Sequence, residues 1–317
     1  MVTVNPYKIY QIGGKLVKIN VIGMPLYYGC DRDGAQYGPD KLRENGLVDI
    51  ITSNGHEVYD MGNIYVPNVS VEDKYKDSEK IKYLNPIVNV NTNLANNVYS
   101  SLVGGGFPFT IGGDHSLGAG SIAGASKYFS DLAVIWVDAH GDINTDETSP
   151  SRNAHGMPLA ASMNVGHPSL TNIYFQGQKV KPENVHIIGV REIDEGEKKL
   201  VERLKLNFYT METVREKGLN NLLQKIIGDI KASNVDGVHL SFDIDVLDAS
   251  LVPGTGTPVN NGFTMDEGKH LLTTILNEKF VTSMDFVEFN PKIDHEDGRT
   301  LNNCLELLDH IFKVMGS

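Results

Sequence analysis

Short β-rich runs alternate with helical patterns along nearly the whole chain, and this alternation restricts the possible folds most strongly. Several runs carry apolar residues at successive positions, as strands do when helices cover both faces of a sheet. Strands that alternate with helices form a parallel sheet, either open or closed into a barrel, and periodicity alone does not separate the two. The eight expected strands are LVKINVI (16–22), HEVYDM (56–61), FPFTI (107–111), LAVIWV (132–137), NVHIIGV (184–190), KLNFYT (205–210), GVHLSF (237–242) and VTSMDFVEF (281–289).

Helical patterns fill the gaps between these runs. Apolar residues recur at steps of three and four over residues 87–102, 219–230 and 301–312, which predicts helices that bury one face. Thr264 and Glu267 have the spacing of a capping box, so a further helix is expected to begin there. No linker, internal repeat or low-complexity tract interrupts the pattern, and we expect one domain over residues 1–317.

Charge and cysteine content exclude several classes of protein. Lys and Arg number 28 against 40 Asp and Glu, a net charge of −12, which disfavours nucleic-acid and membrane partners. Two cysteines, Cys30 and Cys304, are too few for a disulfide framework and fit a reducing compartment. No apolar run approaches the roughly 18 residues of a membrane span. Residues 1–15 lack the pattern of a signal peptide, so we expect a cytoplasmic protein.

Residues suited to chemistry gather where four of the expected strands end. GGDHS (112–116), DAHGD (138–142) and DID (243–245) each follow a strand, and Glu288 lies near the end of the last one. In both architectures the ligand site lies at the C-terminal ends of the strands. The sequence therefore predicts that these four segments meet in one crevice.

Two of these segments repeat acidic or imidazole side chains at a spacing of two. Asp138, His140 and Asp142 alternate, as do Asp243 and Asp245. Alternate residues of an extended segment face the same way, so each set is expected to point to one side. Carboxylates packed together without cations would repel one another and take up protons. Bound metal ions are the simplest way to keep them ionised.

The charge of the predicted cluster matches two divalent cations. Four aspartates supply the negative charge and two neutral histidines complete the set. These residues are His115, Asp138, His140, Asp142, Asp243 and Asp245. A ligand set rich in oxygen and free of thiolate favours manganese or a similar ion. Two metals roughly 3.5–4 Å apart can bridge a water and lower its pKa from about 15.7 toward about 7, giving a hydroxide nucleophile at neutral pH.

Asp114 receives a different interpretation. An aspartate after a strand is most often a helix N-cap, and a single histidine is more often structural than a ligand. Because its neighbour His115 is the better metal ligand, Asp114 is expected to cap a helix or to act indirectly.

The motifs resemble those of a known family. GGDHS, DAHGDIN, SPSRNAHGMP, SFDID and EFNP are similar in order and spacing to the metal and substrate motifs of the ureohydrolases, and most closely to those of arginases. The resemblance implies an α/β fold, a three-layer α/β/α sandwich around an eight-stranded, mainly parallel sheet. It also implies two Mn²⁺ per subunit, L-arginine as the substrate, and a homo-oligomer, either trimer or hexamer.

The resemblance also divides the metal ligands. The first metal would be held by His115, Asp138, Asp142 and Asp243. The second would be held by His140, Asp138, Asp243 and Asp245. Asp138 and Asp243 would therefore bridge the two ions.

The implied reaction converts L-arginine and water to L-ornithine and urea by attack of a metal-bridging hydroxide on the guanidinium carbon. Glu288 resembles the glutamate that pairs with the guanidinium, and a two-pronged contact would fix the plane of that group. His155 resembles the acid–base or proton-shuttle histidine, and Asp142 shares in the transfer.

Further positions match residues that hold the other end of the substrate. Donors for the α-carboxylate correspond to Asn144, Ser151 and Asn153. Residues that face the α-ammonium correspond to Asp194 and Glu197, with Thr257 also near the substrate. Together these positions favour arginine over agmatine, which lacks the carboxylate.

Three departures from the arginase pattern bear on substrate affinity. Arg152 replaces a common glycine, so a positive φ there would be strained; its side chain either draws the carboxylate closer or points into solvent. Val246 and Ala249 replace a typical glycine and proline.

Three alternatives stay open. The nearest is an agmatinase or another guanidino-acid ureohydrolase. A metal-dependent amide hydrolase of the same fold is more distant, because the motifs of deacetylases do not match. The third is a non-catalytic, metal-binding regulatory homologue, which would bind metal and ligand without turnover.

Overall fold

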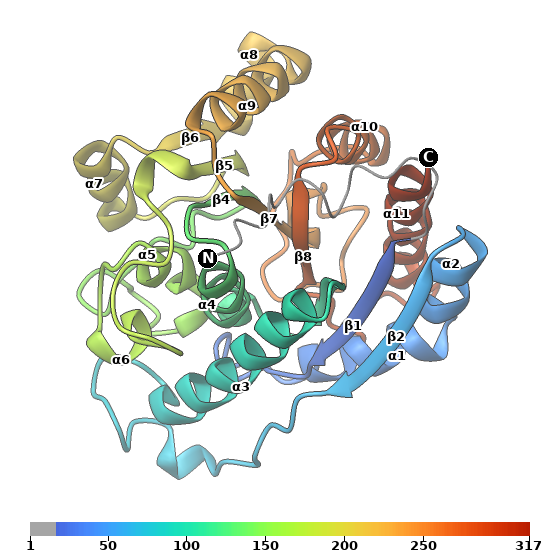
Figure 1. Ribbon diagram of the computed structural model, residues 1–317. Coiled ribbons are helices and arrows are strands. Elements are labelled where there is room, and N and C mark those ends of the chain that lie inside the picture. The colour runs from blue at the N-terminus through green and yellow to red at the C-terminus, as the bar shows by residue number, and fades with distance from the viewer. Residues whose placement is uncertain (1–16) are drawn as a thin grey trace.

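A single eight-stranded sheet forms the centre of the molecule, in the order β2-β1-β3-β8-β7-β4-β5-β6 (Figure 1). The computed structural model describes residues 17–317; residues 1–15, expected to carry no signal peptide, and Leu16 of the first expected strand lie outside them. Every strand pair is parallel. The strands are β1 (Lys18–Met24), β2 (Glu57–Asn63), β3 (Phe107–Gly112), β4 (Leu132–Val137), β5 (Val185–Val190), β6 (Asn207–Thr210), β7 (Gly237–Asp243) and β8 (Val281–Val287).

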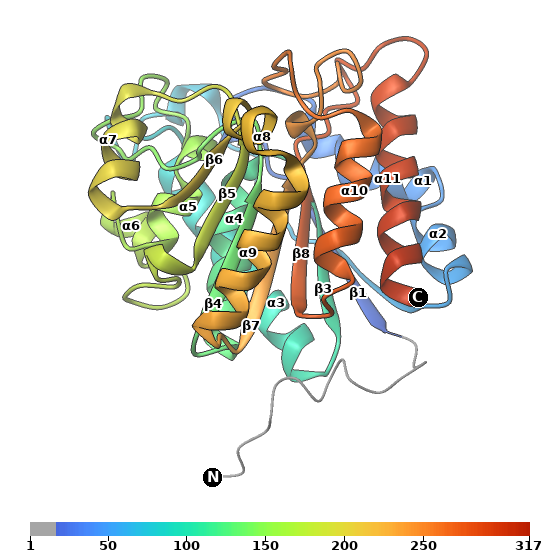
Figure 2. The ribbon, with the colours of Figure 1, turned by 90° about the horizontal axis from the view of Figure 1, so that it is seen from above.

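Helices cover both faces of this open sheet (Figure 2). They are α1 (Gly38–Glu44), α2 (Leu47–Ser53), α3 (Leu84–Val103), α4 (Gly118–Tyr128), α5 (Pro158–Ser162), α6 (Pro168–Thr171), α7 (Glu195–Leu204), α8 (Met211–Lys217), α9 (Leu219–Ser233), α10 (Met265–Leu276) and α11 (Arg299–Gly316). One core joins the sheet to α1, α2 and α8–α11, and the other joins it to α3–α7. The predicted three-layer α/β/α sandwich is confirmed, and the barrel is excluded.

Alternation along each strand explains why the expected strands look apolar on both faces. In β1, Ile19 and Val21 enter one core, whereas Ile22 and Met24 enter the other. The edge strand β2 has no fully buried residue, because helices and neighbouring strands cover it least. A central strand therefore has to be apolar at nearly every position, and an edge strand does not.

Local signals set most element boundaries. Thr264 Oγ1 accepts from the Glu267 amide and Glu267 Oε2 accepts from the Thr264 amide, which confirms the capping box of α10. Lys205, with φ +54°, ends α7, so β6 begins at Asn207 instead of at residue 205. Cys304 is fully buried on α11. Among the described helices, none combines the length and apolarity needed to cross a membrane.

At Gly189 we expect no larger residue to fit without a loss of stability. It lies in β5 with φ +106°, and a Cβ there would lie 2.4 Å from Val246 Cγ2 and 2.9 Å from the Asp138 carbonyl oxygen. Steric overlap and backbone strain add, so Gly189→Ala is expected to lower the free energy of unfolding by about 3 kcal/mol or more. Urea denaturation followed by circular dichroism measures this change.

The matched control is Gly228→Ala on α9, where an added Cβ meets no atom within 4 Å. Because alanine favours a helix, this variant should gain up to about 1 kcal/mol. If both variants were as stable as the parent chain, the close approach at Gly189 would be wrong.

Candidate metal centre and substrate site

Four neighbouring strands bring the site residues to one edge of the sheet. β3, β8, β7 and β4 are adjacent in the sheet although they are distant in sequence. The chain leaves β3 through α4 and returns at β4, on the far side of β8 and β7. Such a change of direction opens a crevice at the C-terminal ends of the strands. The segments 112–116, 138–142 and 243–245 and Glu288 all lie at these ends.

The first group of ligand atoms surrounds His115. Its Nδ1 lies 2.9 Å from Asp138 Oδ2 and 3.2 Å from the Oδ2 atoms of Asp142 and Asp243. Its Nε2 lies 2.8 Å from Ser241 Oγ. A ring that donates from Nε2 to the serine directs the lone pair of Nδ1 toward the carboxylates, and a cation at that position makes the arrangement favourable. His115, Asp138 and Asp243 form one group that could hold a metal ion.

The second group surrounds His140. Its Nδ1 lies 3.1 Å from Asp245 Oδ2 and 3.4 Å from Asp138 Oδ1. Its Nε2 lies 3.6 Å from Glu192 Oε2. Asp138, His140 and Asp245 form a second group able to hold a metal ion. Asp138 belongs to both groups and turns a different oxygen to each histidine.

Protonation behaviour provides a test of whether cations fit this cluster. Burial, followed by repulsion from Asp138, raises the pKa of Asp142 to about 7. Burial and repulsion from Asp245 and Asp138 raise the pKa of Asp243 well above its ordinary value. Burial opposes the charge of His115, but its contacts with Asp138, Asp142 and Asp243 outweigh burial and raise its pKa. Without cations the cluster therefore takes up protons, and its oxygen and imidazole donors suit divalent ions.

The predicted extended conformation of the segment from Asp138 to Asp142 is wrong, although its side chains do converge. The backbone bends at residues 139–140, and Asp142 has φ +51°. Simple alternation therefore does not bring Asp142 to His115; a left-handed backbone position does. Sequence periodicity does not reveal such a position in a residue other than glycine.

Three residues that the sequence did not predict support the candidate ligands. The Trp136 ring stacks on His115, with centroids 3.9 Å apart, and its Nε1 donates to Asp138 Oδ2 at 3.0 Å. Ser241 contacts His115, and Glu192 contacts His140. Trp136 and Ser241 each precede a candidate ligand by two positions in a strand, so they share its face of the sheet. This spacing could have identified Trp136 and Ser241 from the sequence as neighbours of the candidate ligands.

Asp114 has the indirect role expected of it. It is fully buried and caps the short 3₁₀ helix His115–Leu117 through the Ser116 amide. Its Oδ2 accepts from the amides of Gly29 and Cys30 at 2.8 and 3.2 Å. Asp114 therefore ties the segment before α1 to the candidate metal centre.

Glu288 lies beside the centre in a strained conformation. Its φ is +70°, and its side chain is 1% exposed. Oε1 accepts from the His115 amide at 2.8 Å, whereas Oε2 has no hydrogen-bond partner among the described residues. A Cβ at Gly256 would lie 3.4 Å from Oε2. Strain and an unpaired buried carboxylate oxygen are both typical of a ligand-binding position.

His155 lies next to Glu288. Its Nδ1 is 3.3 Å from Glu288 Oε1, and its amide donates to the Gly29 carbonyl oxygen. Burial favours the neutral ring, but the contact with Glu288 outweighs burial and raises the pKa of His155 to about 9. In the protein without bound metal, the ring therefore carries a proton that it can donate at neutral pH.

The pKa of His155 can be measured directly. In the metal-free protein we expect its ring to titrate near 9, so its stabilising contribution is fully present below pH 6.5 and is lost as pH rises through 9. NMR titration of the histidine rings, assigned with His155→Asn, tests this value. In Glu288→Gln the midpoint should fall, because the neighbouring charge is removed; an unchanged midpoint would contradict the coupling.

The candidate carboxylate donors lie on one loop. Asn144 is buried and donates from Nδ2 to Asp194 Oδ2 at 2.8 Å. Asn153 donates from Nδ2 to the Cys30 carbonyl oxygen at 3.0 Å. Ser151 is exposed, and its Oγ accepts from the Asn153 amide. The structure thus links Asn153 to Cys30 and Asn144 to Asp194.

The other candidate substrate residues differ in how free their side chains are to bind a ligand. Glu197 is buried, and both its oxygens accept backbone hydrogen bonds, from Asp194 and Ile143. It holds the loop of Asn144 against the start of α7, which leaves Asp194 as the more available acid. Thr257 donates from Oγ1 to Asp245 Oδ2 at 3.2 Å, which places it at the edge of the candidate metal centre.

The three departures from the arginase pattern have different surroundings. Arg152 has the strained positive φ predicted for it, +62°. Its exposed guanidinium lies 5.8 Å from the centroid of the Tyr75 ring. Val246 is buried against Gly189. The Ala249 amide donates to the Val259 carbonyl oxygen, a bond that proline cannot make.

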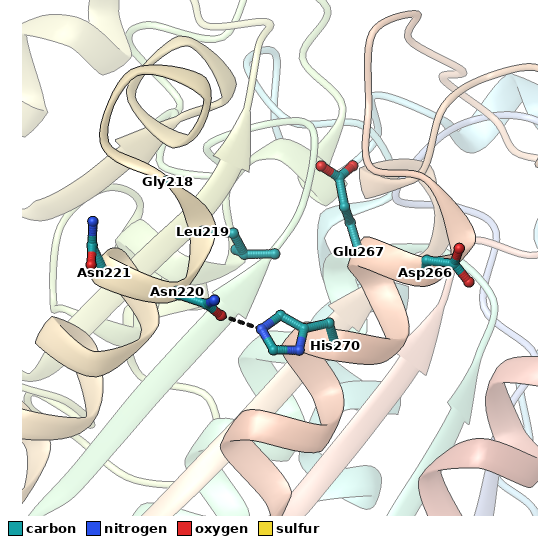
Figure 3. Close-up of a pocket in the computed structure, with 7 residues that line it drawn as sticks. All are labelled: Gly218, Leu219, Asn220, Asn221, Asp266, Glu267 and His270. Carbon is teal, nitrogen blue, oxygen red and sulfur yellow. Dashed lines mark hydrogen bonds between the residues drawn. The ribbon is translucent and has the colours of Figure 1, made fainter.

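Surface hollows do not by themselves locate this centre. One hollow of about 500 Å³ lies where α9 and α10 begin, and there His270 contacts Asn220 (Figure 3). Another of about 510 Å³ lies between α7 and residues 143–148. Neither contains a residue of the two candidate metal-binding groups, so the cluster of buried ionisable residues is the stronger indicator of the site.

Comparison with known proteins agrees with this geometry. A model of the arginase family matches residues 17–313. The chain belongs to the arginase family. A relative named arginase from Bacillus subtilis (strain 168) is 40% identical over 293 residues, covering 92% of this chain and 97% of the relative. The predicted family is therefore confirmed.

Solved arginase structures share the fold. The native arginase of Bacillus caldovelox has a TM-score of 0.87 and 38% identity, covering 94% of this chain and 98% of its own. Entamoeba histolytica arginase in complex with L-ornithine has a TM-score of 0.85 and 31% identity, covering 95% of this chain and 99% of its own. The arginase fold thus extends over nearly all of this chain.

Proposed function

We propose that this member of the arginase family hydrolyses L-arginine to L-ornithine and urea at a centre of two Mn²⁺ ions. The observation that carries the proposal is the pair of imidazole–carboxylate groups that share Asp138. Buried beside them, Glu288 keeps one carboxylate oxygen without a partner. A cation centre next to an anionic recognition group suits a guanidinium that must be bound and then attacked.

Six residues would hold the ions. They are His115, Asp138, Asp142 and Asp243 for one ion, with His140, Asp138, Asp243 and Asp245 for the other. When bound, such a pair of divalent cations supplies the Lewis acidity that activates water at neutral pH. Ser241, Trp136 and Glu192 keep the two rings and Asp138 in place, as residues around metal ligands commonly do.

The remaining residues bind the substrate and move protons. Glu288 pairs with the guanidinium and holds its plane toward the centre, because its backbone and Oε1 are already fixed. His155, 3.3 Å from Glu288 Oε1, gives its proton to the amine that leaves as L-ornithine. Asp142, whose charge interacts with that of the His155 ring, shares in this proton transfer.

The far end of the substrate would meet the loop of residues 144–153. Asn144, Ser151 and Asn153 would serve the α-carboxylate, and Asp194 would serve the α-ammonium with Glu197 behind it. Thr257 would border the guanidinium end through its bond to Asp245. We also propose a cytoplasmic homo-oligomer, a trimer or hexamer, by analogy with the family.

A urea assay tests the proposal. Purified protein is incubated with L-arginine or agmatine, with and without added MnCl₂. Manganese-dependent urea release from L-arginine, at least tenfold above that from agmatine, is expected, because only arginine offers a carboxylate to the loop. Preference for agmatine would identify an agmatinase instead. Tight binding of manganese and L-ornithine without any turnover would identify a regulatory homologue.

A further inference from the structure

A segment with four lysines and four acidic residues contacts the loop that carries the candidate carboxylate donors. Residues 71–83 run alongside residues 149–153, and the Lys82 amide donates to the Arg152 carbonyl oxygen at 3.1 Å. The Arg152 guanidinium lies over the Tyr75 ring. Backbone and side chains therefore both join the two segments, and groups on residues 71–83 can influence the substrate loop.

The ammonium group of Lys82 contacts that loop. Its Nζ lies 2.8 Å from Asn153 Oδ1 and 3.0 Å from Asp31 Oδ2. The Lys82 side chain is 15% exposed and that of Asp31 19%. Contacts this close and this sheltered are screened less by solvent than surface ion pairs.

Asp31 binds two lysines at once. Lys74 Nζ lies 2.8 Å from the same Oδ2 atom that Lys82 contacts. Burial opposes its charge, but the hydrogen bonds from Lys74 and Lys82 lower the pKa of Asp31, so it is ionised at neutral pH. Of these two lysines, Lys82 also donates to Asn153 Oδ1, whereas Lys74 makes no hydrogen bond to Asn153.

The contacts of Asn153 also fix the orientation of its amide group. Lys82 has only donors, so it must face Oδ1, and the Cys30 carbonyl can only accept, so it must face Nδ2. One N–H of Nδ2 is used by Cys30, which leaves the second for another acceptor. An amide held in this way presents a donor at a defined position.

We propose that Lys82 determines specificity for substrates that carry an α-carboxylate. It does so as a positioning residue, by orienting the donor of Asn153 toward the place where the carboxylate binds. This inference rests on the proposed function, since it takes the loop of Asn153 to be the carboxylate end of the site. Ligands without a carboxylate gain nothing from Lys82.

Two lysine variants provide a matched comparison. Lys82→Met removes the contacts with Asp31 and Asn153, whereas Lys74→Met removes a contact with the same atom of Asp31 but no hydrogen bond to Asn153. Isothermal titration calorimetry on manganese-loaded protein measures the affinity for L-ornithine and for putrescine, which differ only in the carboxylate. Lys82→Arg tests rescue by a residue of the same charge.

We expect Lys82→Met to weaken L-ornithine binding roughly tenfold to a hundredfold, as loss of a charged hydrogen bond does, and to leave putrescine within about twofold. Lys74→Met should leave both affinities within about twofold, and Lys82→Arg should recover most of the loss. With L-arginine, Lys82→Met should raise KM more than it lowers kcat.

Several outcomes would overturn the inference. One is an equal loss of L-ornithine affinity in the Lys82 and Lys74 variants, since that indicates a general effect on residues 71–83. Another is equal weakening of L-ornithine and putrescine. Melting temperatures identify a misfolded variant, for which Lys82→Gln replaces Lys82→Met. If the parent chain hydrolyses L-arginine while these differences are absent, only the role of Lys82 fails; if it neither hydrolyses L-arginine nor binds L-ornithine, the proposed function fails as well.

Discussion

Asp138→Asn should reduce manganese-dependent hydrolysis of L-arginine by at least about a thousandfold, because removing one unit of a catalytic centre disables the whole centre. Asp138 is the residue that faces both histidines, with Oδ2 toward His115 and Oδ1 toward His140. An amide of the same shape keeps the packing but loses the charge and one oxygen ligand. Urea release and manganese content, measured by mass spectrometry of the metal, should fall together.

A companion variant separates metal binding from folding. Burial and like charges raise the pKa of Asp243, so in the metal-free protein its ionisation destabilises the fold as pH rises above the pKa it has in the unfolded chain. At neutral pH, Asp243→Asn should therefore raise the melting temperature of the metal-free protein and abolish the stabilisation that manganese gives. Asp229→Asn on α9, beside Lys225, is the control. Full activity with normal manganese content in either site variant would refute the ligand assignment.

Glu288→Gln should lower kcat/KM for L-arginine by roughly a hundredfold to a thousandfold while leaving manganese content unchanged. The side chain is buried, and its Oε2 has no partner among the described residues. A guanidinium opposite a neutral amide loses a buried charge pair, which is worth about 3–4 kcal/mol. Glutamine still accepts from the His115 amide, so the backbone near that ligand should keep its place.

Steady-state kinetics and metal analysis on the same preparation provide the test. Loss of manganese along with activity would show that Glu288 acts on the metal centre instead of on the substrate. Activity equal to that of the parent chain would exclude guanidinium pairing by this residue.

Local sequence signals predicted much of the architecture. All eight strands begin and end within two residues of their expected positions, and Thr264 with Glu267 marks the start of α10. These features depend on neighbours in the chain, which is why periodicity reveals them. The segment from Asp138 to Asp142 is an exception. Alternation correctly predicted that its side chains converge, but a bend in the backbone and the positive φ of Asp142 bring them together instead.

In the candidate site, too, some features could be predicted from the sequence and others could not. Residue type and spacing identified the carboxylates, the imidazoles and Glu288. They did not reveal that Trp136 stacks on His115, that both oxygens of Glu197 are used by backbone amides, or that Lys82 reaches Asn153. Apart from the contact between the Asp194 amide and Glu197, which lie three residues apart at the start of α7, each of these contacts joins residues that are remote in sequence.

The sequence by itself determined which groups are present and at which strand ends they stand, because a residue's chemistry and its place in a strand are local properties. Only the tertiary structure decided that β3, β8, β7 and β4 are neighbours, and so which of those ends share a crevice. Strand order depends on how crossover helices pack both faces of the sheet, and that packing involves the whole chain at once.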